Sequence, residues 1–378
     1  MVYRIPAVNL VGRGCLAQLK DEIGTLGCKK ALVVSDKFLT ENGVVEKVTK
    51  VLDQVGIEHT LYNDVKQNPS VANVEGGLEV LKKENCDFIV SIGGGSPQDC
   101  GKAISVLATN GGKITDYEGV NKSQKKCLPI VAIATTAGTS AEVTINYVIT
   151  DEETHIKMIM VDRNTLASIT VNDAELMLSK PAGLTAATGM DALTHAIEGY
   201  TTKAAWEMTD MFHIKAIELI SDSLRGAVEN TPEGREGMAM GQYIAGMGFS
   251  NVGLGIVHSM AHALGAVYDT PHGVANAILL PTVMEYNADA TGDKYKYIAK
   301  AMGVKGVEDM TQEEYRKAAV DAVKKLSADV GIPADLKEIV KEEDIQFLAE
   351  SAYADACAPG NPKDASVEDI IGLYKSLL

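Results

Sequence analysis

Short runs of apolar and β-branched residues recur through the first 183 residues of the chain. The runs occupy residues 31–35, 88–92, 130–134, 144–150 and 167–171. The first three are almost entirely apolar, which is typical of strands that are buried on both faces of a parallel sheet. Segments with apolar residues at helical spacing lie between the runs, at residues 41–54, 71–84 and 97–108. This alternation predicts β-α-β units and therefore a doubly wound α/β domain.

The pattern changes after residues 178–183, which have the sequence LSKPAG. The β-rich runs stop there, and apolar positions three and four residues apart indicate successive helices. The clearest helical segments are residues 205–228, 235–249, 311–330 and 366–378. We therefore predict two domains, an α/β domain at residues 1–183 and an all-α domain at residues 184–378.

The composition of the 378 residues, 46% hydrophobic and 23% charged, is that of a globular protein. A formal net charge of −16 repels phosphate backbones and anionic lipid headgroups, so we expect neither nucleic acid nor a membrane as a partner. Residues 1–14 lack the features of a secretory signal, and no window approaches the roughly 18 uninterrupted apolar residues of a membrane span. These observations predict a cytoplasmic protein.

The cysteines are scattered and form no C-x-x-C pair. They are Cys15, Cys28, Cys86, Cys100, Cys127 and Cys357. This spacing favours buried free thiols in a reducing compartment over a disulfide framework or a thiolate metal site.

A glycine-rich segment, SIGGGSPQDCGKAI at residues 91–104, follows one of the apolar runs. Gly93, Gly94 and Gly95 let the backbone approach a ligand closely, and the start of the following helix offers free N–H groups to a pyrophosphate. The segment does not match the G-x-G-x-x-G fingerprint, and a simple tight turn is the alternative interpretation.

A second turn, ATTAGTSAE at residues 134–142, follows the next apolar run and supplies hydroxyl donors from Thr135, Thr136 and Thr139. Ligands of open α/β sheets bind at the carboxyl ends of the strands, so two such turns on neighbouring strands are expected to converge on one crevice. Asp36 ends the first apolar run, where a carboxylate accepts ribose hydroxyls and disfavours a 2′-phosphate, which predicts NAD rather than NADP. The alternative is that Asp36 caps the next helix.

The segment DALTHAIEGY at residues 191–200 places Asp191 and His195 one helical turn apart on the same face. When such a pair stands alone, a local hydrogen bond or a cap is the more common explanation. The segment 255–278 adds three histidines within fifteen residues. These are His258, His262 and His272.

One carboxylate and several imidazoles without a thiolate suit a divalent first-row metal such as iron(II), zinc or manganese. A lone helical histidine is more often a core residue, so the clustering is what favours a metal site. The remaining histidines, His59, His155 and His213, are expected to be structural or exposed.

The ordered motifs GGGSPQD, TTAGTSAEVT, GMDALTHAIEGY and HSMAHALGAVYDTPHGVANAILLP resemble those of the iron-dependent alcohol dehydrogenase family. They lie in the family's order and span most of the chain. The resemblance implies an N-terminal doubly wound dinucleotide-binding domain and an all-α C-terminal domain, which is a dehydroquinate-synthase-like fold. Two positions depart from the family pattern, since Ala263 replaces a common proline and Asp269 a usual asparagine.

The resemblance also implies roles for individual residues. The metal ligands are Asp191, His195, His258 and His272, and His262 faces the nicotinamide as the catalytic residue. The residues near NAD are Asp36, Asn68, Gly93, Gly94, Gly95, Ser96, Thr135, Thr136, Thr139 and Lys157. The substrate pocket is lined by Asn146, Phe249 and Cys357.

The activity implied is metal-dependent hydride transfer between NAD(H) and a small alcohol or aldehyde, with Fe2+ as the metal and Zn2+ or Mn2+ as alternatives. From residue 11 to residue 374 the chain most resembles the branch of the family that acts on lactaldehyde and 1,2-propanediol. Sister enzymes for glycerol, 1,3-propanediol or butanol share most of these motifs. A related lyase of the dehydroquinate synthase type is disfavoured, because residues 185–200 and 250–285 contain no Lys or Arg for an anionic substrate.

The family often forms homodimers, and residues 3–5 are a candidate edge strand for such a contact. We therefore expect a homodimer.

Overall fold

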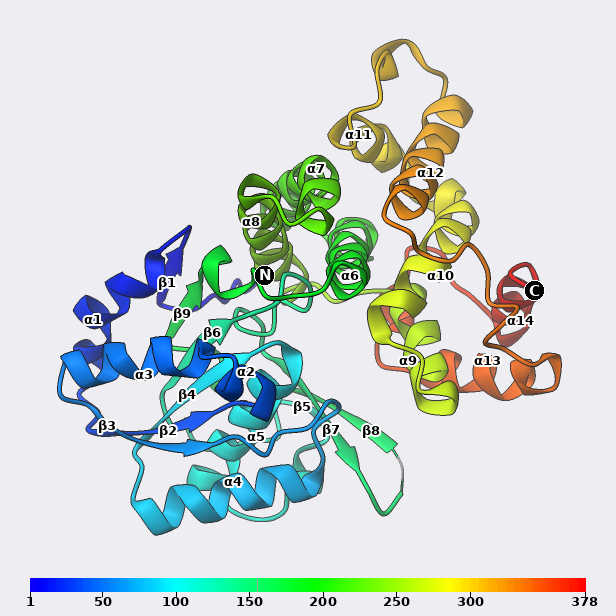
Figure 1. Ribbon diagram of the computed structural model, residues 1–378. Helices are drawn as coiled ribbons and strands as arrows, with labels where there is room; N and C mark the ends of the chain where they lie inside the picture. Colours follow the sequence, from blue (N-terminus) through cyan, green and yellow to red (C-terminus); the bar gives the residue numbers. More distant parts are fainter. Residues whose placement is uncertain (155) are drawn as a thin grey trace. The chain divides into compact units, whose positions relative to one another are not determined.

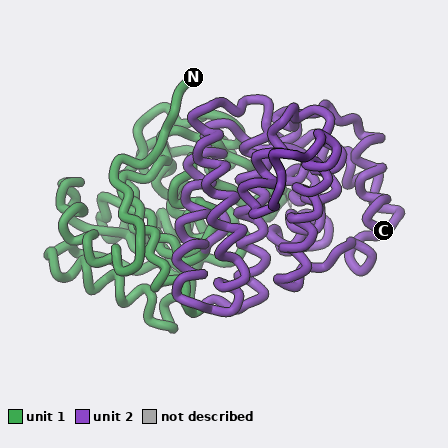
Figure 2. Tube along the Cα trace, turned by 90° about the horizontal axis from the view of Figure 1, so that it is seen from above, with its two compact units in different colours: residues 1–136, 140–179 green, residues 137–139, 180–378 purple. Residues whose placement is uncertain are grey.

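The computed structural model describes residues 1–154 and 156–378, so the prediction for His155 lies outside the described residues (Figure 1). The chain forms two compact units. Unit 1 comprises residues 1–136 and 140–179, and unit 2 comprises residues 137–139 and 180–378 (Figure 2). The predicted domain boundary at residue 183 stays a prediction, because a domain is a part that folds independently and compactness alone does not test that.

Unit 1 is built around a six-stranded sheet in the order β1-β9-β6-β4-β2-β3, and every neighbouring pair in it is parallel. Its strands are β1 (Val8–Val11), β2 (Lys30–Val34), β3 (Glu58–Tyr62), β4 (Phe88–Gly93), β6 (Ile130–Ala134) and β9 (Ile169–Asn172). The predicted doubly wound α/β architecture is therefore confirmed.

Both faces of this sheet are covered by helices, which are α1 (Leu19–Glu22), α2 (Lys37–Glu41), α3 (Val44–Gln54), α4 (Val71–Glu84) and α5 (Gly95–Asn110). Leu32 and Ile89 pack into a core with residues of α4 and α5. Their neighbours Val33 and Val90 point the other way, into a core with residues of α1 and α3. Figure 1 shows α3 and α4 on opposite sides of the sheet. Burial on both faces explains the unbroken apolar runs of the central strands.

A second, three-stranded sheet in unit 1 has the order β5-β8-β7. Its strands are β5 (Gly119–Val120), β7 (Asn146–Asp151) and β8 (Ile156–Val161), and β7 pairs with β8 in antiparallel fashion. The predicted strand at residues 144–150 belongs to this sheet. Residues 3–5, the candidate edge strand, lie outside the strands of the single chain, and β1 is an edge of the main sheet.

Unit 2 is helical, as predicted for this half of the chain. Its helices are α6 (Ala182–Thr201), α7 (Glu207–Val228), α8 (Pro232–Phe249), α9 (Ile256–Tyr268), α10 (His272–Asn287), α11 (Lys294–Ala301), α12 (Gln312–Asp329), α13 (Ile345–Ala354) and α14 (Val367–Lys375). α6 packs against α7, α8 and α10, while α9 packs against α10 and α13. Every residue of α6 from Gly189 to Thr201 is buried, so the polar residues of this stretch are held away from water.

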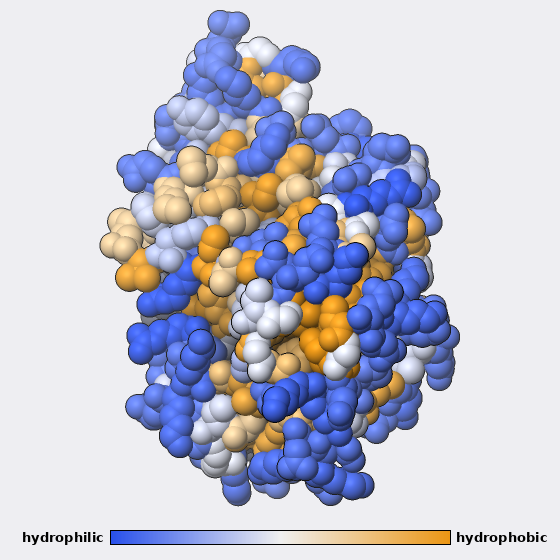
Figure 3. Space-filling model, turned by 90° about the vertical axis from the view of Figure 1, so that its left-hand side faces the viewer, coloured by the Kyte–Doolittle hydropathy of each residue, from blue (hydrophilic) through white to orange (hydrophobic). Residues whose placement is uncertain are grey.

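The surface and the thiols agree with the composition. All six cysteines are free, as predicted, but only four are buried, since Cys28 and Cys357 are half-buried. Within the described residues, no helix has both the length and the apolar character that a bilayer crossing requires. On the face drawn in Figure 3, hydrophilic residues cover much of the surface and apolar residues are exposed between them. Apolar exposure of this kind is ordinary for a folded protein.

Candidate metal centre and cofactor turns

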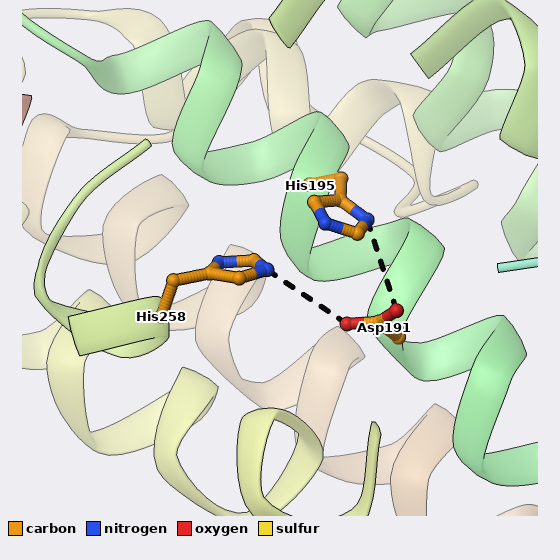
Figure 4. Close-up of side chains that lie close together, drawn as sticks. All are labelled: Asp191, His195 and His258. Carbon is orange, nitrogen blue, oxygen red and sulfur yellow. Dashed lines mark ion pairs between the residues drawn. The ribbon is translucent and has the colours of Figure 1, made fainter. Parts of the chain in front are cut away.

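Three polar side chains from two helices of unit 2 converge in the interior. Asp191 and His195 lie one turn apart on α6, and His258 lies in the first turn of α9. Their candidate ligand atoms all lie within 4.8 Å of one another, and all three residues are buried. Asp191 Oδ2 is 3.9 Å from His195 Nδ1, and Asp191 Oδ1 is 3.8 Å from His258 Nε2 (Figure 4). The two imidazole rings are stacked with their centroids 4.5 Å apart, and the carboxylate lies beside both of them (Figure 4).

His272 approaches the same carboxylate from the start of α10. Its Nε2 atom is 3.5 Å from Asp191 Oδ1, and its side chain is 41% exposed whereas that of Asp191 is 2% exposed. Its ring centroid is 5.3 Å from that of His258. The structure thus brings the four residues predicted as ligands together, three in a buried cluster and His272 at its more exposed side. Their role as ligands stays a prediction.

Asn276, which the sequence analysis did not single out, lies at the centre of this group. Its Nδ2 atom is 2.7 Å from Asp191 Oδ1, 3.2 Å from His258 Nε2 and 3.1 Å from His272 Nε2. One amide nitrogen therefore faces an acceptor oxygen and two imidazole nitrogens at once. Asn276 lies four residues after His272 on α10 and shares its face of the helix, but an amide at this spacing is too common in helices to stand out in the sequence.

The residues present fit a divalent metal ion. His195 Nδ1 and Asn276 Oδ1 are buried, and neither has a hydrogen-bond partner among the described residues. Burial lowers the pKa of both His195 and His258, the latter well below its ordinary value, so both rings stay neutral and keep a lone pair for a metal. One carboxylate and neutral imidazoles form a donor set for a first-row divalent ion.

A second polar group, formed by His262, Asp355 and Cys357, lies beside the candidate metal ligands. The Nδ1 atom of His262 is 2.8 Å from Asp355 Oδ2, and the backbone N–H of Cys357 donates to Asp355 Oδ1 at 2.8 Å. Burial raises the pKa of Asp355, but the hydrogen bond and the charge of His262 outweigh it and leave this pKa below its usual value. Burial, followed by the charge of Asp355, raises the pKa of Cys357 well above its ordinary value, so the sulfur remains a thiol.

The aromatic ring of Phe249, at the end of α8, stacks on His195 with the ring centroids 4.2 Å apart. The rings of His262 and His272 are stacked at 5.4 Å. Phe249 and His262, predicted as substrate and catalytic residues, therefore border the candidate metal ligands. Asp355 was missed because it is 93 residues from His262 in the sequence.

The two predicted cofactor turns meet at the carboxyl ends of neighbouring strands in unit 1. Gly93 ends β4, Gly94 is the N-cap of α5 and Gly95 is the first residue of α5. β4 pairs with β6, which leads into the second turn. A Cβ atom on Gly94 would lie 2.9 Å from the methyl group of Thr136, so glycine is what permits the two turns to approach this closely. The two turns therefore lie side by side, and their binding of one dinucleotide stays a prediction.

Of the other cofactor candidates in these two turns, Ser96 and Thr135 belong to unit 1 and Thr139 belongs to unit 2. Ser96 is in the first turn of α5, and Thr135 is buried in unit 1. Thr139 belongs to the short segment 137–139 that is part of unit 2.

Three further candidates for the cofactor site lie in unit 1. Asp36 is the N-cap of α2 and accepts a hydrogen bond from the backbone N–H of Leu39 at 2.8 Å, which confirms the capping interpretation. Its role toward a ribose stays a prediction. Lys157 Nζ donates to Asn68 Oδ1 at 3.3 Å, so the structure brings these two predicted residues together.

Asn146, predicted to contact substrate, is the first residue of β7, and its backbone carbonyl accepts a hydrogen bond from Lys102 Nζ at 2.7 Å.

The two described histidines that were expected to be structural or exposed differ in their surroundings. His59 pairs with Asp53 at 3.1 Å, and His213 is buried between Gly199 and Gly248.

Comparison with known proteins relates the whole chain to one family. Residues 6–174 match the model of iron-containing alcohol dehydrogenases, and residues 185–378 match that of the C-terminal part of the Fe-containing alcohol dehydrogenase family. The chain is 54% identical to lactaldehyde reductase of Escherichia coli (strain K12) over 366 residues, which is 96% of each chain.

Two solved structures extend this comparison. The crystal structure of a 1,3-propanediol oxidoreductase covers 100% of this chain and 99% of its own, with a TM-score of 0.97 and 43% identity. That of sulfoacetaldehyde reductase from Bifidobacterium kashiwanohense in complex with NAD+ covers 100% of this chain and 98% of its own, with a TM-score of 0.89 and 30% identity.

Proposed function

This chain belongs to the iron-containing alcohol dehydrogenase family, and we propose that it transfers hydride between NAD(H) and a small alcohol or aldehyde, with 1,2-propanediol and lactaldehyde as the preferred pair. The observation that carries the proposal is the convergence of Asp191, His195 and His258 in one buried cluster, with His272 beside them. The identity to lactaldehyde reductase supports the choice of substrate.

The proposed metal ligands are Asp191, His195, His258 and His272, and the proposed metal is Fe2+. A divalent metal bound there supplies a Lewis acid for the oxygen of the substrate. The four side chains supply one carboxylate and three imidazoles, and the burial of Asp191, His195 and His258 limits the access of bulk water to the site.

The proposed cofactor is NAD. The residues assigned to it are Asp36, Asn68, Gly93, Gly94, Gly95, Ser96, Thr135, Thr136, Thr139 and Lys157. The glycine turn and the first turn of α5 offer backbone N–H groups to the pyrophosphate, while Asp36 disfavours a 2′-phosphate. The nicotinamide ring supplies or accepts the hydride. The NAD+ complex of the sulfoacetaldehyde reductase supports this assignment.

We assign the proton transfer to His262. Its Nδ1 atom is engaged by the carboxylate of Asp355 at 2.8 Å, which leaves Nε2 as the nitrogen that exchanges a proton with the substrate hydroxyl, directly or through a ribose hydroxyl. Asp355 orients the ring in this role.

The proposed substrate residues combine one polar and two less polar side chains. Asn146 is assigned as the hydrogen-bond partner of the second hydroxyl of a diol. Phe249, held flat against His195, supplies an apolar wall, and Cys357 supplies a neutral thiol. We also propose a cytoplasmic homodimer as the working form of the enzyme.

Anaerobic purification with metal analysis, followed by NADH oxidation against lactaldehyde, glycolaldehyde and propanal, tests this function. We expect about one iron per chain and the highest kcat/KM with lactaldehyde. A protein that binds no divalent metal, or a metal-loaded protein that oxidises NADH with none of these aldehydes, would refute the proposal.

The activities of the sister enzymes are tested by measuring the oxidation of alcohols with NAD+. The similarity to 1,3-propanediol oxidoreductase favours a diol with separated hydroxyls as the second candidate substrate. A higher kcat/KM for 1,3-propanediol, glycerol or butanol than for 1,2-propanediol, measured with NAD+, would reassign the substrate while leaving the reaction class intact.

A further inference from the structure

A buried glutamate adjoins the candidate metal ligands and has no role in the proposed reaction. Glu198 lies on α6 seven residues after Asp191 and three after His195, so the three side chains share one face of the helix. Glu198 is 5% exposed. A buried carboxylate needs strong hydrogen-bond partners to be retained in such a place.

Glu198 finds its partners at the start of α9. Its Oε1 atom accepts a hydrogen bond from the backbone N–H of Val257 at 2.8 Å, and its Oε2 atom is 2.5 Å from His258 Nδ1. A Cβ atom on Gly255 would lie 2.9 Å from Oε1, so the glycine before the helix leaves room for the carboxylate. Because a backbone N–H can only donate, Oε1 is fixed as an acceptor.

The neighbours of His258 on its other side determine which ring nitrogen carries the proton. Asp191 Oδ1 is an acceptor, so the atom of Asn276 that lies 2.7 Å from it is the amide nitrogen. The same nitrogen is 3.2 Å from His258 Nε2. The amide nitrogen carries two hydrogens. With one directed to Asp191 Oδ1 and the other to His258 Nε2, Nε2 holds a lone pair and the proton of the neutral ring is on Nδ1, where Glu198 Oε2 accepts it.

We propose that Glu198 is a positioning residue of the metal centre, which holds His258 in the Nδ1–H form so that the Nε2 lone pair faces Asp191. The inference rests on the proposed function, because a metal ion is the ligand that this lone pair serves. Carboxylates that fix the second nitrogen of a metal-binding histidine typically change metal affinity by about 10- to 100-fold when they are replaced.

Glu198→Gln is the sharpest test, because it keeps the size of the side chain and replaces one carboxyl oxygen with an amide NH2 group. The amide oxygen must stay on the Val257 N–H, so the amide NH2 group faces His258 Nδ1 and favours the opposite tautomer, with the proton on Nε2. We expect Glu198→Gln to bind Zn2+ and Fe2+ about 10- to 100-fold more weakly, measured by competition with a chromophoric chelator after metal removal.

Glu236→Gln is the matched control, because Glu236 is an exposed residue of α8 and undergoes the same chemical change. It should keep the wild-type affinity. If Glu198→Gln binds both metals as tightly as the wild type does, the inference is wrong while the proposed function stands. A wild-type protein that binds neither metal refutes the proposed function instead.

Nuclear magnetic resonance of metal-stripped protein with 15N-labelled histidine shows which nitrogen of His258 carries the proton. A purely structural role of Glu198 would not change this tautomer. The His258 signal, assigned by its loss in His258→Ala, should show a protonated Nδ1 in the wild type and a protonated Nε2 in Glu198→Gln. A wild-type His258 that carries its proton on Nε2 would overturn the inference, and this measurement decides the matter even if Glu198→Gln does not fold.

Discussion

Two groups of charged side chains, one around Lys102 in unit 1 and one around Asp191 in unit 2, are held in opposite ways. In unit 1, Lys102 Nζ donates to the backbone carbonyls of Thr144 at 2.9 Å and of Asn146 at 2.7 Å, and Asp99 accepts from the backbone N–H of Val148 at 3.1 Å. In unit 2, Asp191 and its neighbouring imidazoles face one another instead.

This difference distinguishes charged side chains that support the fold from side chains that form a binding site. Charges anchored to backbone groups hold a strand in place, and they need no further ligand. Side chains that converge on one point, with buried atoms of His195 and Asn276 left without partners among the described residues, are arranged for a cation. The predictions that follow test this distinction, from the largest expected effect to the smallest.

His258→Ala should remove metal retention and turnover together. The substitution deletes an imidazole from the buried cluster, and a metal held by the remaining side chains would be lost during purification. We expect kcat/KM to fall by at least about 10²-fold, the scale seen when one preorganised electrostatic contact to a reacting oxygen is removed. His59→Ala, in unit 1, is the control and should keep both properties. A metal-replete, active His258→Ala protein would contradict the ligand assignment.

Removal of the metal from the wild type should lower the stability of unit 2 selectively. A ligand that binds only the folded state, at a free concentration 100 times its Kd, stabilises that state by about 2.7 kcal/mol. Thermal unfolding with and without a chelator, followed by probes placed in each unit, measures the difference. The chelator should have no effect on His258→Ala, and an equal effect on that variant would show that the chelator acts elsewhere.

The sequence predicted the centre of the sheet better than its edges. β2, β4 and β6 are buried on both faces, so their sequences are unbroken apolar runs. β3 lies at an edge of the sheet, and its sequence, EHTLY, is mostly polar or half-exposed. The strand β8 alternates between buried and more exposed residues in a hairpin. Partial exposure removes the apolar signal on which a sequence prediction depends.

The candidate metal centre shows the same limit at the level of single residues. Asp191, His195 and His258 are visible in the sequence because their side chains are distinctive metal ligands at helical spacing. Glu198 and Asn276 lie on the same helices as predicted ligands, yet carboxylates and amides are too common in helices to stand out alone. Asp355 reaches His262 only through the packing of α13 near α9, which no local pattern records.

Lys102→Met should weaken unit 1 without affecting the metal. Methionine cannot donate to the carbonyls of Thr144 and Asn146, and leaving such buried acceptors without a donor costs about 1–3 kcal/mol. Denaturant unfolding of unit 1 and metal analysis measure the two outcomes. Lys66→Met is the control, because Lys66 is exposed. Loss of metal from Lys102→Met would contradict the distinction between the two regions.

The same variant should change how stability depends on pH. Burial lowers the pKa of Lys102 from 10.5 to about 8. Between about pH 8 and 10.5 the unfolded chain therefore binds more protons at this lysine than the folded chain does, so Lys102 alone contributes a rise of stability with pH across that window, against the opposite contribution of the buried thiols. Lys102→Met should lack this rise, and an identical slope in both proteins would show that another group causes it.

Asn146→Ala tests a residue that belongs to both sides of the comparison. Its backbone carbonyl accepts a hydrogen bond from Lys102, and its side chain is proposed to contact the substrate. Lys102 holds the backbone carbonyl of residue 146, which alanine retains, so the strand should keep its place while only the side-chain amide is lost. Lactaldehyde and propanal differ by one hydroxyl, and a hydrogen bond to that hydroxyl is worth about 0.5–1.5 kcal/mol. We expect kcat/KM for lactaldehyde to fall by about 2- to 10-fold relative to propanal. Equal losses with both aldehydes would mean that the amide does not recognise the second hydroxyl, and that residue 146 belongs with Lys102 to the architecture of unit 1.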